Sequence, residues 1–154
     1  MALIWMGEPI QPPLGRGDSA PEVALSTLEG PTVRLSDLSG QVVLINFWAT
    51  WCKPCEDEMP AMQRLYHSLS EDNFEMLAIS VDESSPDVEA FASRMGLDFP
   101  ILLDPEQKTS RLYQTTGFPE SILVDRNGQI VERYVGPRQW DHPDYEARIR
   151  SLMD

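Results

Sequence analysis

Basic residues are scarce in this sequence of 154 residues. Lysine and arginine number 12 against 25 aspartates and glutamates, which gives a formal net charge of −13. Nucleic acids and anionic membrane surfaces bind basic patches, so this balance argues against both as partners. An acidic surface could steer a basic partner, and ordinary solubility is the alternative explanation of the charge.

Long apolar runs are also missing. A membrane-spanning helix needs about 20 consecutive apolar residues, and neither such a segment nor a complete secretory signal is found. A short apolar patch, Ala2–Gly7, precedes a stretch rich in proline and glycine. We expect residues 1–17 to form a tether and residues 18–154 to form the domain. We also expect a signal segment or membrane anchor ahead of this sequence, with a disordered N-terminal arm as the alternative.

The rest of the composition is that of a single globular domain. The length is too short for two domains of ordinary size. Apolar residues make up 42% of the sequence and charged residues 24%, fractions typical of a soluble protein with a hydrophobic core.

Cysteine is scarce as well, and the two copies lie close together, at Cys52 and Cys55. They follow an apolar run over residues 41–48 and precede an amphipathic helical pattern. If the helix begins near Lys53, its N-terminus favours the reactive thiolate of Cys52 and places Cys55 one turn further, in the interior. Pro54 suits the first helical turn, and the nearby cation of Lys53 is expected to favour the thiolate. The spacing predicts that Cys52 attacks a disulfide and that Cys55 resolves the mixed disulfide.

Two other roles for the cysteine pair are possible. A purely structural disulfide would close a very small loop, which constrains the unfolded chain little. A zinc site would need four ligands, and the sequence offers only His67 and His142 besides the cysteines, without the spacing of a zinc finger. The pattern therefore favours reversible redox chemistry.

The segment Phe47–Cys55 resembles the active-site segment of the thioredoxin superfamily. From about Gly17 to the C-terminus, the sequence resembles the TlpA/ResA/CcmG-like branch of extracytoplasmic thiol–disulfide oxidoreductases. The resemblance implies an α/β fold, the thioredoxin-like three-layer sandwich with a mixed central sheet and an added N-terminal β-hairpin. Residues 22–35 are expected to form that hairpin.

The apolar patterns along the chain predict the same class of fold. Strands alternate with helices, and a terminal hairpin and helix follow, which is typical of an α/β sandwich with a mixed sheet. The strands are expected over residues 41–48, 74–81, 99–103, 121–125 and 129–135. The helices are expected directly after the cysteines, from residue 85, over 107–114 and over 141–153.

The resemblance also implies a docking site for partner proteins. Pro119 matches the cis-proline that thioredoxin-like proteins place against the cysteine pair, with an ordinary trans proline as the alternative. The backbone of Phe118 would then pair with an incoming peptide as an added strand. Trp51 is expected to line the docking surface, and Trp48 to fill the core.

Glu58 is a candidate for proton transfer. It matches a glutamate that the ResA-like branch places three residues after the second cysteine, whereas Asn46 stands where thioredoxins carry an aspartate. Glu58 is expected to modulate the thiol pKa values and to accept the proton of Cys55. A carboxylate near the sulfurs disfavours the thiolate, so a reductant is expected. Glu56 and Asp57 are also explained as ordinary acidic residues at a helix N-terminus.

We therefore expect a monomeric protein disulfide reductase that acts in the periplasm or elsewhere outside the cytoplasm. Its partners would be oxidised substrate proteins, apocytochrome c in cytochrome c maturation among them, and a membrane thiol donor that recharges it. No cofactor is expected beyond the Cys52–Cys55 disulfide, and no metal. The rivals are a thiol peroxidase, which needs a lone peroxidatic cysteine in another setting, and a copper metallochaperone, whose cysteines lie one residue further apart.

Overall fold

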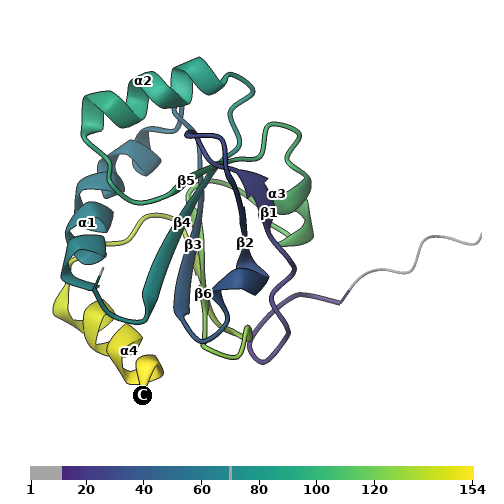
Figure 1. Cartoon of the computed structure of the whole chain (residues 1–154), viewed down its shortest axis with the longest axis vertical. Coiled ribbons are helices and arrows are strands. Elements are labelled where there is room, and N and C mark those ends of the chain that lie inside the picture. The colour runs from purple at the N-terminus through teal and green to yellow at the C-terminus, as the bar shows by residue number, and fades with distance from the viewer. Residues whose placement is uncertain (1–11, 70) are drawn as a thin grey trace, which may run out of the picture.

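The computed structural model describes residues 12–69 and 71–154 and forms an α/β sandwich (Figure 1). The apolar patch Ala2–Gly7 and most of the expected tether lie outside the described residues. The strands are β1 (Ala24–Ser26), β2 (Thr32–Arg34), β3 (Val42–Trp48), β4 (Phe74–Ser80), β5 (Ile101–Leu103), β6 (Glu120–Val124) and β7 (Ile130–Val135). The helices are η1 (Leu35–Leu38), α1 (Lys53–Leu69), α2 (Ser85–Met95), α3 (Lys108–Leu112) and α4 (Pro143–Met153).

The central sheet is mixed, as the sequence predicts. Its strand order is β5-β4-β3-β6-β7, and β3 lies in the middle with every residue buried. It pairs parallel with β4 and antiparallel with β6. Strands buried on both faces have continuous apolar sequences, which explains the uninterrupted run of β-branched and aromatic residues in β3.

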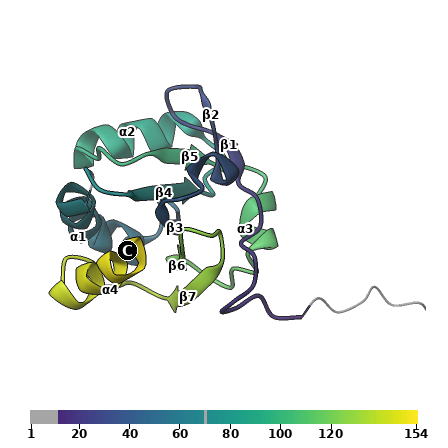
Figure 2. The same ribbon diagram turned by 60° about the horizontal axis from the view of Figure 1, so that its bottom comes forward.

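The two faces of the sheet carry two separate cores. Alternate residues of a strand point to opposite faces, so Leu44 and Trp48 belong to one core while Ile45 and Phe47 belong to the other. Helices α1, α2 and α4 cover the first face, and α3, η1 and the hairpin β1–β2 cover the second (Figures 1 and 2). This layering is the three-layer sandwich expected from the resemblance.

The N-terminal segment runs along both edges of the sheet (Figure 2). Near the start of the described chain, Ser19 forms a bridge to Gln129 beside β7. After β1, Thr27 forms a bridge to Leu102 of β5 at the opposite edge. The hairpin that the sequence predicts is therefore packed against the sheet and paired with β5, while the chain ahead of it is paired with the residue before β7.

The fold brings two distant segments to one end of β3. The chain leaves β3 at Trp48 and enters α1 at Lys53, so the cysteine pair lies at this carboxyl end. Strand β6 begins there as well, because Glu120 is paired with Phe47.

Helix α1 continues through Pro60 to Leu69. In the described parts of the chain, no helix combines the length and apolar character needed to cross a membrane.

Candidate active site

The cysteine pair is closed into a disulfide at the beginning of α1. The Cα atoms of Cys52 and Cys55 lie 5.3 Å apart. Cys52 is 7% exposed, whereas Cys55 is completely buried. Cys52 is thus the more accessible of the two, as the sequence predicts, although it is more enclosed than an outward-pointing side chain would be.

The beginning of α1 directs a backbone donor at Cys52. The carbonyl oxygen of Cys52 accepts the first helical hydrogen bond, from the Glu56 N–H at 3.1 Å, which makes Cys52 the N-cap residue. The N–H of Cys55 points at Cys52 Sγ over 3.3 Å. This donor is one that a helix leaves unpaired, and an N-cap side chain commonly accepts it. A thiolate on Cys52 would be favoured by the same donor.

Lys53 contributes less positive charge to this end of the helix than the sequence suggests. Its ammonium lies 2.9 Å from Asp57 Oδ1 and 3.7 Å from Glu56 Oε2. The hydrogen bond to Asp57 and the charges of both carboxylates raise the pKa of Lys53. The two acids therefore neutralise the cation that was expected to favour the Cys52 thiolate.

A buried aspartate holds the turn in front of the cysteines. Asp82 is 6% exposed and accepts hydrogen bonds from the Thr50 N–H at 2.9 Å and the Thr50 hydroxyl at 2.5 Å. Ser80, at the end of β4, donates to the same carboxylate at 2.6 Å. The turn between β3 and Cys52 is thus fixed to the neighbouring strand. Sequence analysis missed Asp82, since 32 residues separate it from Thr50.

Glu58 is the one acid of its run that is buried. It is 4% exposed, and it follows Cys55 by three positions, which places both side chains on the inner face of α1. Glu56 instead pairs with Arg94 at 2.9 Å on the surface, and Asp57 pairs with Lys53. The structure therefore separates the three successive acids as helical spacing requires.

Three hydrogen bonds hold the Glu58 carboxyl group. Asn46 Nδ2 donates to Oε1 at 2.8 Å, while the Arg138 N–H and Trp140 Nε1 donate to Oε2 at 3.0 and 3.1 Å. Asn46 also donates to Ser121 Oγ at 2.8 Å. Burial raises the pKa of the Glu58 carboxyl, and the bonds from Arg138, Asn46 and Trp140 limit that rise. The segment between β7 and α4 was not predicted to contribute, and no local signal marks Trp140.

The segment before β6 completes the site. The Phe118–Pro119 peptide bond is cis, which confirms the expected isomer. The carbonyl oxygen of Phe118 lies 3.5 Å from Cys52 Sγ. Trp51 is 68% exposed, and its ring meets that of Phe118 edge to face with 6.0 Å between the centroids. An aromatic pair, with Trp51 exposed and Phe118 half-buried, therefore adjoins the cysteines, whereas Trp48 is buried in the core as expected.

Neither histidine lies with the cysteines in a cluster of metal ligands. His67 Nε2 is 2.7 Å from Asp98 Oδ2, and His142 Nδ1 accepts a hydrogen bond from the Asp144 N–H at the start of α4. Among residues 12–69 and 71–154, no group of three or more histidine, cysteine or acidic side chains is placed to hold a metal ion.

A disulfide at the N-terminus of a helix, facing a cis-proline segment in a thioredoxin-like sandwich, defines a thiol–disulfide oxidoreductase. The chain belongs to the AhpC/TSA family, whose model matches residues 16–133, and within it to the ResA-like thiol–disulfide oxidoreductases. It is 42% identical over 120 residues to the thiol-disulfide oxidoreductase ResA of Bacillus thuringiensis, which covers 78% of this chain and 69% of the relative.

Further relatives agree with this assignment. ResA of Geobacillus kaustophilus is 42% identical over 136 residues, which cover 88% of this chain and 77% of that protein. The crystal structure of a thiol:disulfide interchange protein DsbE from Chlorobium tepidum aligns with a TM-score of 0.85 at 35% identity. That alignment covers 92% of this chain and 99% of the other. The chain is therefore an enzyme of thiol–disulfide exchange.

Proposed function

We propose that this oxidoreductase acts as a reductase of disulfides in partner proteins, with Cys52 as the attacking thiol and Cys55 as the resolving thiol. The observation that carries the proposal is the arrangement of the pair. Cys52 keeps some exposure and receives a backbone donor, while Cys55 is buried one turn along the helix. Attack on a partner disulfide needs an accessible thiolate. Resolution of the mixed disulfide needs a second thiol that is hidden from the partner and lies within reach of Cys52.

The exchange proceeds in two steps. In the first, the Cys52 thiolate forms a bond to one partner sulfur, the partner disulfide breaks, and the other partner sulfur leaves and takes up a proton. In the second, Cys55 gives its proton to Glu58, and its thiolate attacks Cys52 Sγ. The mixed disulfide breaks and releases the second partner thiol, which takes up a proton. The partner gains two electrons and two protons, and the enzyme is left with its Cys52–Cys55 disulfide.

The buried position of Glu58 supports its proposed role. A carboxylate in the interior near the sulfurs favours the protonated thiols, so it disfavours the reduced, thiolate-bearing form that a strong oxidant stabilises. Glu58 also lies on the same helical face as Cys55, and its pKa is raised by burial. When the pKa of the carboxyl group is raised, it lies closer to the pKa of a thiol. The carboxylate is then a better proton acceptor in the second step.

The proposed docking surface consists of the exposed ring of Trp51 and the half-buried ring of Phe118, with the buried Pro119 behind them in the chain. The rings offer apolar area beside Cys52, and the Phe118 carbonyl lies next to the Cys52 sulfur that would attack the partner. A partner segment lying along Phe118 would place its own disulfide in line with Cys52.

The resemblance to extracytoplasmic reductases supports the remaining parts of the proposal. The protein would work outside the cytoplasm with a membrane anchor, receive electrons from a membrane dithiol donor, and act on oxidised apocytochrome c among other proteins. Protein disulfides persist mainly in such oxidising compartments, where a dedicated reductase is needed.

The central test is insulin disulfide reduction with dithiothreitol as the donor. Cys52→Ser should abolish the enzyme's contribution, while Cys55→Ser should accumulate a mixed disulfide that mass spectrometry detects. Trp51→Ala should lower the rate with insulin and leave the melting temperature unchanged, because its ring is exposed. Full activity of Cys52→Ser would overturn the assigned roles. Peroxide consumption, or copper retained after desalting, without insulin reduction would favour the two rival functions.

A further inference from the structure

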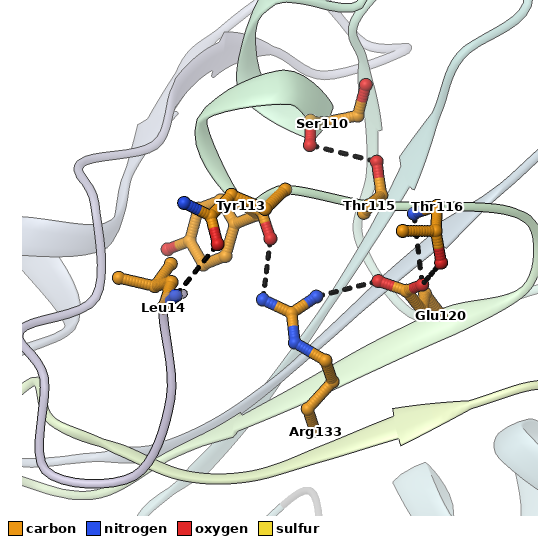
Figure 3. A network of polar contacts seen from close by, with 8 residues as sticks. Leu14, Ser110, Tyr113, Thr115, Thr116, Glu120 and Arg133 are labelled. Carbon is orange, nitrogen blue, oxygen red and sulfur yellow. Dashed lines mark hydrogen bonds and ion pairs between the residues drawn. The ribbon is translucent and has the colours of Figure 1, made fainter. Parts of the chain in front are cut away.

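A buried carboxylate closes the segment that carries Phe118 and Pro119 (Figure 3). Glu120 is 1% exposed and directly follows Pro119. Its Oε1 accepts hydrogen bonds from the Thr116 N–H at 3.1 Å and the Thr116 hydroxyl at 2.9 Å. The side chain of Glu120 therefore joins the two ends of the five-residue segment 116–120.

Arg133 on β7 connects this carboxylate to the chain further upstream. Its Nη1 donates to Glu120 Oε2 at 2.7 Å, and its Nη2 donates to the Tyr113 carbonyl oxygen at 2.6 Å (Figure 3). The two bonds use the fixed, planar fork of the guanidinium group. One arginine thus fixes Tyr113 and Glu120, which lie on either side of the docking segment, to a strand of the sheet.

Other contacts fix the same stretch from further sides. The Thr115 hydroxyl donates to the Ser110 carbonyl oxygen at 2.8 Å. The Gln114 side chain accepts from the Leu14 N–H at 2.7 Å, and the Gly136 N–H donates to the Pro119 carbonyl oxygen at 2.9 Å. The segment is therefore held by α3, by the end of β7 and by the N-terminal chain.

The ion pair at the centre of this network needs a reason other than stability. Its carboxylate is fully buried and its arginine only 21% exposed, and replacing such a pair with apolar residues is often neutral or stabilising. The pair instead fixes the position of the backbone. Every bond described above fixes the backbone on one side or the other of Phe118, whose carbonyl oxygen lies beside Cys52 Sγ.

We propose that Glu120 and Arg133 are positioning residues that hold the Phe118 backbone at the distance from Cys52 that a docked partner requires. The inference rests on the docking role proposed for Trp51 and Phe118. We call the Glu120–Arg133 pair the clamp. A partner protein aligns its backbone with the segment that the clamp holds, so the reaction of the partner depends on it. A small aromatic disulfide needs no such alignment, so its reaction with Cys52 does not.

The test compares two substrates in the complete protein, insulin and 5,5′-dithiobis(2-nitrobenzoate). Glu120→Gln preserves the size of the side chain and an acceptor for Thr116, but it turns the bond to Arg133 into a contact between two donors. We expect kcat/KM for insulin to fall about tenfold, the change that the loss of one charge-assisted hydrogen bond produces. The rate constant for the small disulfide should stay within about twofold.

A second variant tests whether the two residues act as a unit. Arg133→Met removes both fork bonds, and the double variant Glu120→Gln/Arg133→Met removes the charge pair altogether. If the pair is one clamp, both single variants and the double variant should lose insulin activity to a similar extent, since residues that act together are not additive. Arg150→Met is the matched control, because Arg150 lies on the exposed side of α4 and bridges Asp72 and Glu146 there. This variant should leave the rate constants for both substrates unchanged.

The following outcomes separate the possibilities, with the folded fraction measured for each variant. Equal losses with both substrates would mean that the pair serves stability alone and would overturn the inference. Unchanged insulin kinetics in Glu120→Gln would also overturn it, even if Arg133→Met fails to fold. If Trp51→Ala leaves insulin reduction unchanged, the proposed docking surface itself is wrong. If Trp51→Ala slows insulin reduction and Glu120→Gln does not, only the clamp is wrong.

Discussion

At the scale of single residues, Glu58 shows most clearly what the sequence can and cannot predict about a buried side chain. Helical spacing from Cys55 already distinguishes it from Glu56 and Asp57, which the structure places at the surface. Its three hydrogen-bond donors could not be predicted. Two of them come from residues 138 and 140, about eighty positions away, and no sequence pattern relates them to α1.

The raised pKa of Glu58 predicts how stability depends on pH. Below the ordinary glutamate pKa the group is protonated in both the folded and the unfolded chain. As pH rises towards the higher native pKa, the unfolded chain releases its proton first, so the folded state loses stability. The free energy of unfolding of the native protein should therefore decline relative to Glu58→Gln across this window. Chemical denaturation at several pH values measures it, and parallel curves for the two proteins would contradict the prediction.

Trp140 offers a second residue-scale prediction. Trp140→Phe removes the indole bond to Glu58, which favours the carboxylate, so the pKa of Glu58 should rise further. Stability at neutral pH should fall by about 1–3 kcal/mol, the range for a buried acceptor that loses its partner. NMR titration of the carboxyl carbon measures the shift.

A matched control exists for that variant. Trp48 is equally buried, and its indole nitrogen has no hydrogen-bond partner among the described residues. Trp48→Phe should therefore leave the pKa of Glu58 unchanged. Equal shifts in both variants would assign the effect to lost packing.

At the scale of elements, the sequence predicted nearly every strand and helix. Apolar runs and helical spacing report which face of an element is buried, and turn residues such as Asn127 and Gly128 mark where the chain reverses. Contacts between elements were a different matter. The bonds from Asp82 to Thr50 and from Arg133 to Glu120 depend on how strands and loops are placed side by side, which local patterns do not report.

Pro60 allows a prediction about α1 as an element. It lies inside the helix, is exposed, and cannot donate the hydrogen bond that Ala would supply. Pro60→Ala should raise the free energy of unfolding by about 2 kcal/mol, somewhat less than the full difference in helix propensity. Denaturant unfolding checks this. Pro86→Ala is the control, because Pro86 lies in the first turn of α2, where proline costs no hydrogen bond. An equal gain in both variants would contradict the argument.

At the scale of the whole molecule, the net charge of −13 predicts how partners approach. A lysine-rich peptide with one disulfide should react faster at low salt, and its kcat/KM should fall about tenfold between about 0.01 and 0.15 M ionic strength. The same peptide with glutamine in place of lysine should show little change. Stopped-flow measurements on both peptides test the effect, and identical salt dependence would leave the charge with a role in solubility alone.

The course of the N-terminal chain along both outer strands has one more consequence. Free strand edges expose rows of amide and carbonyl groups on which a second chain can grow as a further strand. Here the bridges at Ser19 and Thr27 occupy part of each edge, so the sheet offers less of a template for polymerisation. Edge-to-edge pairing with other extended chains is correspondingly less favourable.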